Sequence, residues 1–398
     1  MHLLATDPDP DIVRLPWHLP LEEWEGDWVL DVPRGLSRHV VRVVRAGERI
    51  VAVKETNEEI ARTEYGLLRD LVHAGLPAVK PQGVVTDRTT TAGEPLPSAL
   101  VTRHLRWSMP YRLVVQVHNT VEELDRIVDA LVVLLVRLHH AGFYWGDVSL
   151  SNVLFRRSAG ELAAYLVDAE TGEFVPSLSD NLRRYDIEVG AENIYGELLD
   201  LQAAELLGDD LDPLEFAEQL GERYEGLWTA LTEVREFPTD EMWQIERWVE
   251  GLRARGFDVE EMDIVTTDEG RRVRLRPRVV EAGYHARELK AVTGLDVEDA
   301  QAARLLSDLN SYGAHCGMSE MPRQMVALRW LTDIYQPLTA MMPPAMALTT
   351  PPAEFFHEVL VHRWYLSERA GHEVDIFETA ADYLERFGPK QDARGVAR

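Results

Sequence analysis

The sequence predicts an α+β protein, with an antiparallel sheet near the N-terminus, a mainly helical part after it, and a mostly α-helical C-terminal region. The chain has 398 residues, which is too long for one compact core and indicates about two or three domains. Residues 28–54 alternate apolar and polar side chains, as strands do. Several later segments instead repeat their apolar residues at helical spacing.

The N-terminal segments follow one another as strands, a helix, strands and a second helix. The turn signals "PRG" at 33–35 and "AGE" at 46–48 predict a three-stranded antiparallel sheet ending in "IVAVKE". Residues 57–73 have a helical pattern, and Asn57 is able to cap its start. Two further strands are predicted in "GLPAVKPQGVV" and "SALVTRHL", before a long apolar helix at 120–141.

The pattern changes near residue 236, where we expect a domain boundary. The predicted organisation is an N-terminal lobe at 1–105, a second lobe at 106–235 and a mostly helical domain at 236–398. In the last domain we expect a helix that ends at Gly256, followed by a strand pair at 259–265 and 271–280. Three helices are then expected at 283–293, 296–312 and 321–340. A proline-rich connector at 336–356 comes before a final helical region.

Composition narrows the classes of function. With 41 basic and 68 acidic residues the formal net charge is −27, so the average field repels phosphates and nucleic-acid binding is not expected. A single cysteine, Cys316, excludes an internal disulfide framework and fits a reducing compartment. We see neither a secretory signal nor an apolar run long enough to span a membrane, and we expect a soluble cytoplasmic protein.

Two stretches carry chemistry. "YWGDVSLSNVLF" places Asn152 five residues after Asp147, and "YLVDAETGEF" ends an apolar run with Asp168. Upstream, Lys54 closes the strand "VAVK", and Glu64 lies in the next predicted helix. This order of five polar residues resembles the protein-kinase-like superfamily, and most closely its bacterial lipopolysaccharide (Kdo/heptose) kinase-like branch. The resemblance covers roughly residues 28–205, and beyond it the chain is similar to proteins that join such a domain to a C-terminal domain of unknown function.

The resemblance implies a bilobal kinase-like fold that uses ATP and Mg²⁺. Lys54 would contact the α- and β-phosphates, with Glu64 holding its ammonium group. Asn152 and Asp168 would be Mg²⁺ ligands, because Mg²⁺ requires hard oxygen donors. Asp147 would accept or orient the proton of an acceptor hydroxyl.

The sequence also departs from the family's pattern. The phosphate-covering loop has one glycine, Gly35, where the family has a glycine-rich series, and Ser37, Arg38 or His39 would replace the missing contacts. "DAE" stands in place of "DFG", which makes Glu170 either an extra metal ligand or a solvent-exposed acid. Trp145 precedes the catalytic loop as a packing aromatic or as a platform beside the substrate.

Three further features remain open at this stage. By position alone, the backbone of Arg103, His104 and Leu105 corresponds to the hinge that binds adenine. Asp186 either supports the catalytic loop or is a plain helix-start acid. Four of the arginines of "RRVRLRPR" at 271–278 are expected on one face of a strand: Arg272, Arg274, Arg276 and Arg278. Three interpretations of this face stay open. It is exposed and neutralised by nearby acids, it contacts another domain or subunit, or it binds an anion.

The leading interpretation is an ATP- and Mg²⁺-dependent phosphotransferase acting on a hydroxyl of a small molecule, glycan or protein. The sequence has no "APE"-like end to an activation segment, which disfavours protein substrates. Two alternatives stay open. One is a pseudokinase whose C-terminal domain engages a protein partner, and the other transfers AMP by binding ATP in the opposite orientation.

Overall fold

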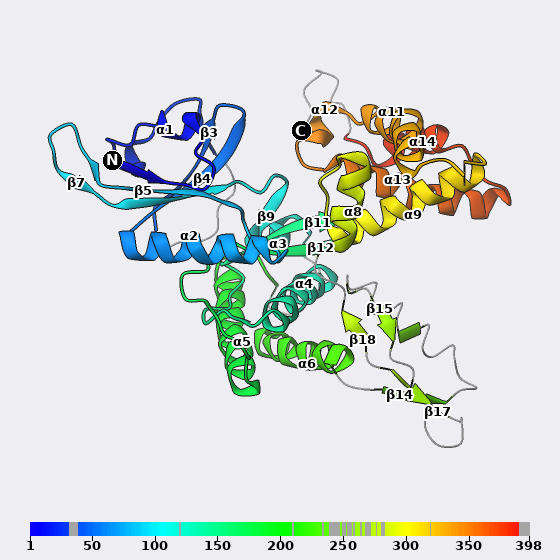
Figure 1. Ribbon diagram of the computed structural model, residues 1–398, viewed down its shortest axis with the longest axis horizontal. Helices are drawn as coiled ribbons and strands as arrows, with labels where there is room; N and C mark the ends of the chain where they lie inside the picture. The colour runs from blue at the N-terminus through cyan, green and yellow to red at the C-terminus, as the bar shows by residue number, and fades with distance from the viewer. Residues whose placement is uncertain are drawn as a thin grey trace. The chain divides into compact units, whose positions relative to one another are not determined.

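The chain folds into two compact units (Figure 1). The first consists of Met1–Arg156 and Ala164–Thr229, and the second of Arg157–Ala163 and Ala230–Arg398. The computed structural model describes residues 1–31, 39–118, 121–208, 211–232, 283–318 and 320–389, with short pieces between 235 and 279.

A six-stranded antiparallel sheet forms the N-terminal lobe of the first unit, in the order β1-β5-β8-β4-β3-β2. The strands are β1 (His2–Leu4), β2 (Val29–Leu30), β3 (Val41–Ala46), β4 (Arg49–Thr56), β5 (Pro81–Thr86) and β8 (Ser98–Arg103). Valine-rich runs favour strands here because branched side chains pack well on a pleated surface. The predicted sheet and its two later strands are confirmed.

Alternation along β4 separates an apolar face of the sheet from a polar one. Val51 and Val53 pack with Trp17 and Trp24 of the N-terminal segment, which contains α1 (Pro10–Val13) and η1 (Leu21–Glu23). Because side chains alternate with period two, Lys54 points to the opposite face. That face is covered by α2 (Glu58–His73), which contacts β5 and β8.

Helix α2 begins where the sequence predicts. The Asn57 side chain accepts a hydrogen bond from the Ile60 amide at 2.8 Å, so it caps the helix. Glu64 and Leu68 lie on the buried side of α2. The helix therefore brings a carboxylate under the sheet.

The second lobe of this unit is mainly helical, and its helices lie together below the sheet in Figure 1. They are α3 (Tyr111–His118), α4 (Val121–His140), α5 (Asp180–Ala203) and α6 (Pro213–Thr232). The predicted long apolar helix is thus confirmed as α4, and Gly142 follows its end with φ of 79°. This lobe also contains short strands, which are β9 (Ser108–Pro110), β10 (Phe143–Tyr144), β11 (Val153–Ser158), β12 (Glu161–Leu166) and β13 (Glu173–Phe174).

The small strands β6 (Arg88–Thr89) and β7 (Pro95–Leu96) form a hairpin beside the sheet. Arg88 is fully buried, and its guanidinium bonds to Glu55 at 2.7 Å and to the Trp17 and Leu19 carbonyls. This contact ties the N-terminal segment to β4.

The second unit is mostly helical, with a core centred on Trp330, Phe355 and Phe356. Its helices are α8 (Tyr284–Thr293), α9 (Asp299–His315), α10 (Arg323–Trp330), the π-helical turn η2 (Leu331–Tyr335), α11 (Gln336–Ala340), α12 (Pro344–Ala347), α13 (Pro352–Ala370) and α14 (Ile376–Phe387). The three predicted helices between 283 and 340 are confirmed.

The proline-rich segment at 336–356 interrupts the helices as predicted, between α11 and α12 and between α12 and α13. Pro344 and Pro352 stand in the first turn of the next helices, because no amide hydrogen is needed there. One expectation for the second unit is wrong. The arginines of 271–278 do not share one strand. Arg272 and Arg274 are on β17 (Arg272–Leu275), whereas Arg278 is on β18 (Pro277–Val279) in another sheet.

The second unit also holds short strands between residues 235 and 279. β17 pairs with β14 (Arg235–Pro238) and β16 (Val265–Thr266), and β18 pairs with β15 (Val259–Met262). Most of the helix predicted to end at Gly256 lies outside the described residues.

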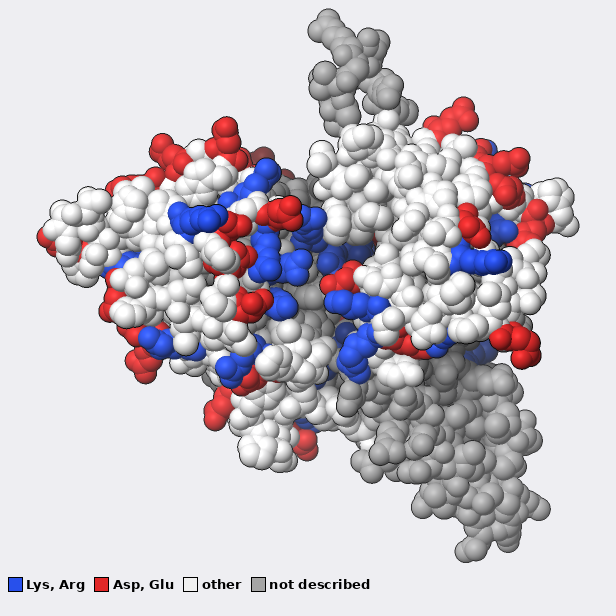
Figure 2. All heavy atoms as spheres, turned by 45° about the horizontal axis from the view of Figure 1, so that its top comes forward, with Lys and Arg blue, Asp and Glu red and all other residues white. Residues whose placement is uncertain are grey.

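On the face drawn in Figure 2, Asp and Glu side chains lie in small groups among Lys and Arg on both units.

Among the residues that the structure describes, none of the helices has the length and apolar composition required to cross a membrane.

Candidate functional site

Lys54 is the centre of a charged cluster in the first unit. Its ammonium Nζ lies 3.0 Å from Glu64 Oε2, 2.8 Å from Asp168 Oδ2 and 3.2 Å from Glu170 Oε2. The three acids come from α2 and from the loop after β12. The structure thus brings together four residues that are up to 116 positions apart in the sequence.

Glu64 is the most buried member of the cluster. Its side chain has no exposed surface, and Lys54 is the only described residue that bonds it. Burial raises the pKa of Glu64 to about 8, helped by repulsion from Asp168 and opposed by attraction to Lys54. Burial alone would lower the pKa of Lys54, but the charges of Glu64 and Asp168 outweigh it and raise that pKa. The lysine is therefore held in its charged form.

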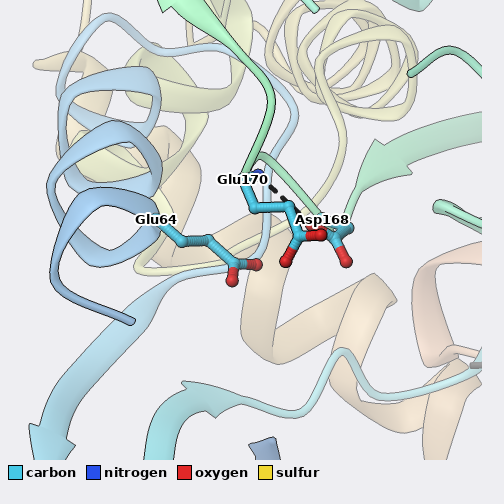
Figure 3. Close-up of side chains that lie close together, drawn as sticks. All are labelled: Glu64, Asp168 and Glu170. Carbon is cyan, nitrogen blue, oxygen red and sulfur yellow. Dashed lines mark hydrogen bonds between the residues drawn. The ribbon is translucent and has the colours of Figure 1, made fainter. Parts of the chain in front are cut away.

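The loop after β12 places the other two carboxylates. The Glu170 amide donates to Asp168 Oδ1 at 3.2 Å, as the dashed line in Figure 3 shows. His39 Nε2 lies 3.6 Å from Glu170, whose side chain is only 14% exposed. Of the two interpretations of Glu170, the solvent-exposed acid is therefore wrong.

Asp168, Glu170 and the carboxyl group of Glu64 share one ammonium group in this cluster, so its acidic groups outnumber its basic one. Oxygens of Glu64, Asp168 and Glu170 all lie within 4.8 Å of one another, and Figure 3 shows the three carboxylates turned toward one point. Oε1 of Glu64 is buried and has no hydrogen-bond partner among the described residues. A hard oxygen donor set of this kind with an unsatisfied buried oxygen fits a divalent cation such as Mg²⁺.

Asp147 and Asn152 form a second, adjoining pair. The Asn152 amide nitrogen donates to the Asp147 carbonyl at 3.1 Å and to its carboxylate Oδ2 at 3.0 Å. The Val167 amide donates to the Asn152 carbonyl at 3.1 Å, which joins this loop to the residue before Asp168. The side-chain oxygen of Asn152 is its remaining polar atom, and it is a suitable metal ligand.

Helix α5 supports this loop with acidic side chains. Both carboxylate oxygens of Asp186 accept backbone amides, those of Trp145 at 2.8 Å and Gly146 at 2.7 Å. Glu197 accepts the amides of Leu150 and Ser151 at 2.9 and 2.8 Å. Of the two interpretations of Asp186, loop support is the one that the structure shows.

Sequence reasoning missed Glu197 and Asn193, whose amide donates to the Val148 carbonyl at 2.8 Å. A signal for them exists, because Asp186, Asn193 and Glu197 are separated by seven and four residues. On an α-helix these spacings place all three on one face. The burial of the acid Asp186 on that face is the unusual feature.

A buried hydrogen-bond chain extends the support behind Asp186. His139 Nε2 lies 3.1 Å from Asp186 Oδ2, and His139 Nδ1 lies 2.7 Å from the Tyr224 hydroxyl, which also accepts a bond from Arg183. The network is consistent with Tyr224 donating to Nδ1 and with a neutral histidine that donates from Nε2.

Trp145 packs within the lobe and does not line a surface. Its side chain is fully buried, and its indole nitrogen donates to the Asp168 carbonyl at 3.1 Å. The interpretation as a packing aromatic therefore holds, and the platform beside a substrate is wrong. The indole also links the loop before Asp147 to Asp168.

The remaining predicted residues are placed only in part. Gly35, Ser37 and Arg38 lie outside the described residues. In the predicted hinge, the Arg103 amide donates to the Lys80 carbonyl at 2.8 Å and the His104 amide to the Ile50 carbonyl at 3.0 Å. Neither of these two amides is available to adenine, and the carbonyl of Leu105 accepts bonds from Ser108.

The first unit consists of an antiparallel sheet and a mainly helical lobe, the α+β architecture that the sequence predicts. An antiparallel sheet carries Lys54, a helix under it carries Glu64, and a mainly helical lobe carries Asp147, Asn152 and Asp168. The second unit is a mostly helical domain.

Comparison with known proteins gives the following. A family described as a domain of unknown function, DUF4032, matches residues 226–387. The chain is similar to the solved structure of WaaP in complex with acyl carrier protein, with 18% identity and a TM-score of 0.33, over 57% of this chain and 100% of that one. It is also similar to the BubR1 kinase domain, with 14% identity and a TM-score of 0.30, over 43% of this chain and 58% of that one. The sequence matches no curated protein.

Proposed function

We propose that the chain is an ATP- and Mg²⁺-dependent phosphotransferase of the lipopolysaccharide-kinase-like type, which transfers phosphate to a hydroxyl group. The main support is that the Lys54 ammonium lies 3.0 Å from Glu64 Oε2 and 2.8 Å from Asp168 Oδ2. A lysine held by a buried carboxylate, beside a second carboxylate, suits the binding of phosphate together with a metal ion.

Lys54 is proposed to bind the α- and β-phosphates. Its ammonium is fixed by Glu64, and it exchanges Asp168 or Glu170 for phosphate oxygens when the nucleotide binds. Because Glu64 is buried on α2 and has no exposed surface, it keeps the ammonium in place during this exchange. Positioning of this kind contributes to the rate by reducing the entropy that is lost in reaching the transition state.

Asp168, Glu170 and the side-chain oxygen of Asn152 are the proposed ligands of Mg²⁺. When bound, the metal ion neutralises charge on the transferring phosphate. The loop bond between Val167 and Asn152 keeps the two parts of this ligand set in a fixed relation.

Asp147 is proposed to orient the acceptor hydroxyl and receive its proton. Asn152 donates to one oxygen of the Asp147 carboxylate at 3.0 Å, which leaves the other oxygen to face the acceptor. Such a positioned base typically contributes about 10²- to 10⁴-fold to the rate.

The acceptor is proposed to be a small molecule or a glycan before a protein. Helix α5 begins at Asp180, only a short loop after Asp168. A long segment that could form a platform for a polypeptide is therefore missing between the site and α5. Any protein partner is expected at the C-terminal domain.

The test compares wild type with three matched Asp→Asn variants. For wild type we expect nucleotide-dependent thermal stabilisation that requires Mg²⁺, together with ATP turnover measured as ADP release. Asp168→Asn should lose the Mg²⁺-dependent stabilisation, and Asp147→Asn should keep it while losing turnover. Asp70→Asn, at a half-exposed position on α2, should match wild type.

The outcomes separate the alternatives. A wild-type protein whose stability is unchanged by ATP with Mg²⁺ would contradict the proposal. Binding without turnover would favour the pseudokinase. A product that carries AMP in place of phosphate, identified by mass spectrometry, would favour the AMP transferase.

A further inference from the structure

The hairpin of β11 and β12 connects two residues of the proposed site. β11 starts directly after Asn152, and β12 ends two residues before Asp168. At the base of the hairpin, the Val167 amide donates to the Asn152 carbonyl at 3.1 Å. The spacing between these two proposed metal ligands therefore depends on how this hairpin is held.

The turn of the hairpin has an unfavourable backbone conformation. Ala159 and Gly160 have φ of 55° and 83°, so both are left-handed. Two successive left-handed residues match the twist of a two-residue hairpin, but an alanine with a positive φ is strained. An additional interaction is needed to stabilise Ala159 in this conformation.

Glu354 supplies that interaction. It lies in the first turn of α13, its residue is only 1% exposed, and its two carboxylate oxygens accept the Ala159 amide at 2.6 Å and the Gly160 amide at 2.8 Å. The turn, residues 157–163, belongs to the same compact unit as α13. Successive amides in a left-handed turn form a concave site for an anion, which the carboxylate fills.

The turn holds one of the two ends of β12. β11 pairs with β9 on its other side, whereas β12 is the edge strand of this sheet. The far end of β12 is held by bonds of Leu166 to Pro77 and Val79. The turn therefore fixes the near end of β12, and a one-residue change of register there would turn its side chains to the other face.

We propose that Glu354 is a positioning residue, which acts through the β11–β12 turn to hold Asn152 and Asp168 at the spacing that a bound Mg²⁺ requires. This inference rests on the proposed function, because it assigns to the C-terminal domain a task in that site. It gives the helical unit a role even though no proposed metal or nucleotide ligand lies in it.

The first test is hydrogen exchange, which needs no nucleotide. In Glu354→Gln one turn amide loses its acceptor, and we expect faster exchange along 153–167, including the Val167 amide. The control is Asp308→Asn, a carboxylate in the same unit that bonds the Trp330 indole at 2.7 Å, which should leave 153–167 unchanged. Glu354→Asp, which is too short to reach both amides, provides a milder variant if the glutamine variant does not fold.

The second test is the Mg²⁺ requirement of ATP binding. Residues that hold metal ligands in place typically change metal affinity by about 10- to 100-fold, so Glu354→Gln should raise the half-saturating Mg²⁺ concentration by at least about tenfold. Asp308→Asn should not change it. Adding Ala159→Gly to Glu354→Gln should restore part of the loss, because glycine adopts the left-handed turn without strain.

The two tests fail separately. If wild type does not bind ATP with Mg²⁺, the proposed function fails, while hydrogen exchange still decides the role of Glu354 in the hairpin. Faster exchange confined to residues 159–160, or a wild-type Mg²⁺ requirement in Glu354→Gln, would overturn the inference.

Discussion

Asp186→Asn is the substitution for which the structure predicts the clearest effect. The carboxylate has no exposed surface, and it accepts bonds from the amides of Trp145 and Gly146 and from His139. Asparagine keeps the size but replaces one acceptor oxygen by an NH₂ group that faces a donor. One charge-assisted bond is lost, worth about 1.5–3 kcal/mol, and a buried donor is left unsatisfied at about 1–3 kcal/mol. We therefore expect the free energy of unfolding to fall by about 3–5 kcal/mol.

Urea denaturation of Asp186→Asn, followed by far-UV circular dichroism, measures this loss. The control is Asp200→Asn on the same helix, where the side chain is 66% exposed and lies 3.7 Å from Arg112, and where we expect a change below about 1 kcal/mol. A loss below about 1 kcal/mol in Asp186→Asn would refute the reasoning, because a buried carboxylate with three donors would then contribute no more than an exposed one.

Three further predictions concern other parts of the chain. Gly190→Ala would place a Cβ atom 2.8 Å from Val148 Cγ1, so it should destabilise the protein by about 1–3 kcal/mol in thermal unfolding and lower ATP turnover. Arg88→Met should cost about 3–5 kcal/mol in urea unfolding because Glu55 loses its buried partner, and Glu55→Gln in the same chain should recover part of it. Burial, together with a neighbouring guanidinium, lowers the pKa of His357 to about 4 from 6.5. As the pH falls, the unfolded state therefore binds the proton before the folded state does. The free energy of unfolding should then decrease between pH 6.5 and 4, by at most about 3 kcal/mol. His357→Gln should reduce that pH dependence, and equal slopes for the two proteins would contradict the assignment.

The site could be located from the sequence where a local pattern assigned a residue to a particular strand or helix. Lys54 was expected at the end of a strand and Glu64 on the following helix, and the structure brings them together at 3.0 Å. The period of the strand and the spacing in the helix specify which faces meet. The same local rules identified Asn57 as the cap of α2, which a bond of 2.8 Å confirms.

What could not be predicted depends on contacts between distant segments. Trp145 has no local signal that separates a packing ring from a surface platform, and its burial results from α5 and the loop after β12. The proline-rich segment at 336–356 interrupts the helices as expected, but the short helix α12 within it was not predicted, because a proline alone does not show whether it begins a helix or ends one. In place of the one strand expected at 271–280, β17 ends at Leu275 and Pro277 begins β18 in another sheet.

One arrangement recurs along the chain from residue 145 to 160. Three acids borne on helices each use both carboxylate oxygens to accept two successive backbone amides. They are Asp186 with 145–146, Glu197 with 150–151 and Glu354 with 159–160. Backbone amides are present whatever side chains the loop carries, so this support constrains the path of the chain and leaves its side chains free to differ. The departures of this loop from the kinase pattern around Asp147 are then compatible with a fixed loop geometry, because the geometry depends on the three acids.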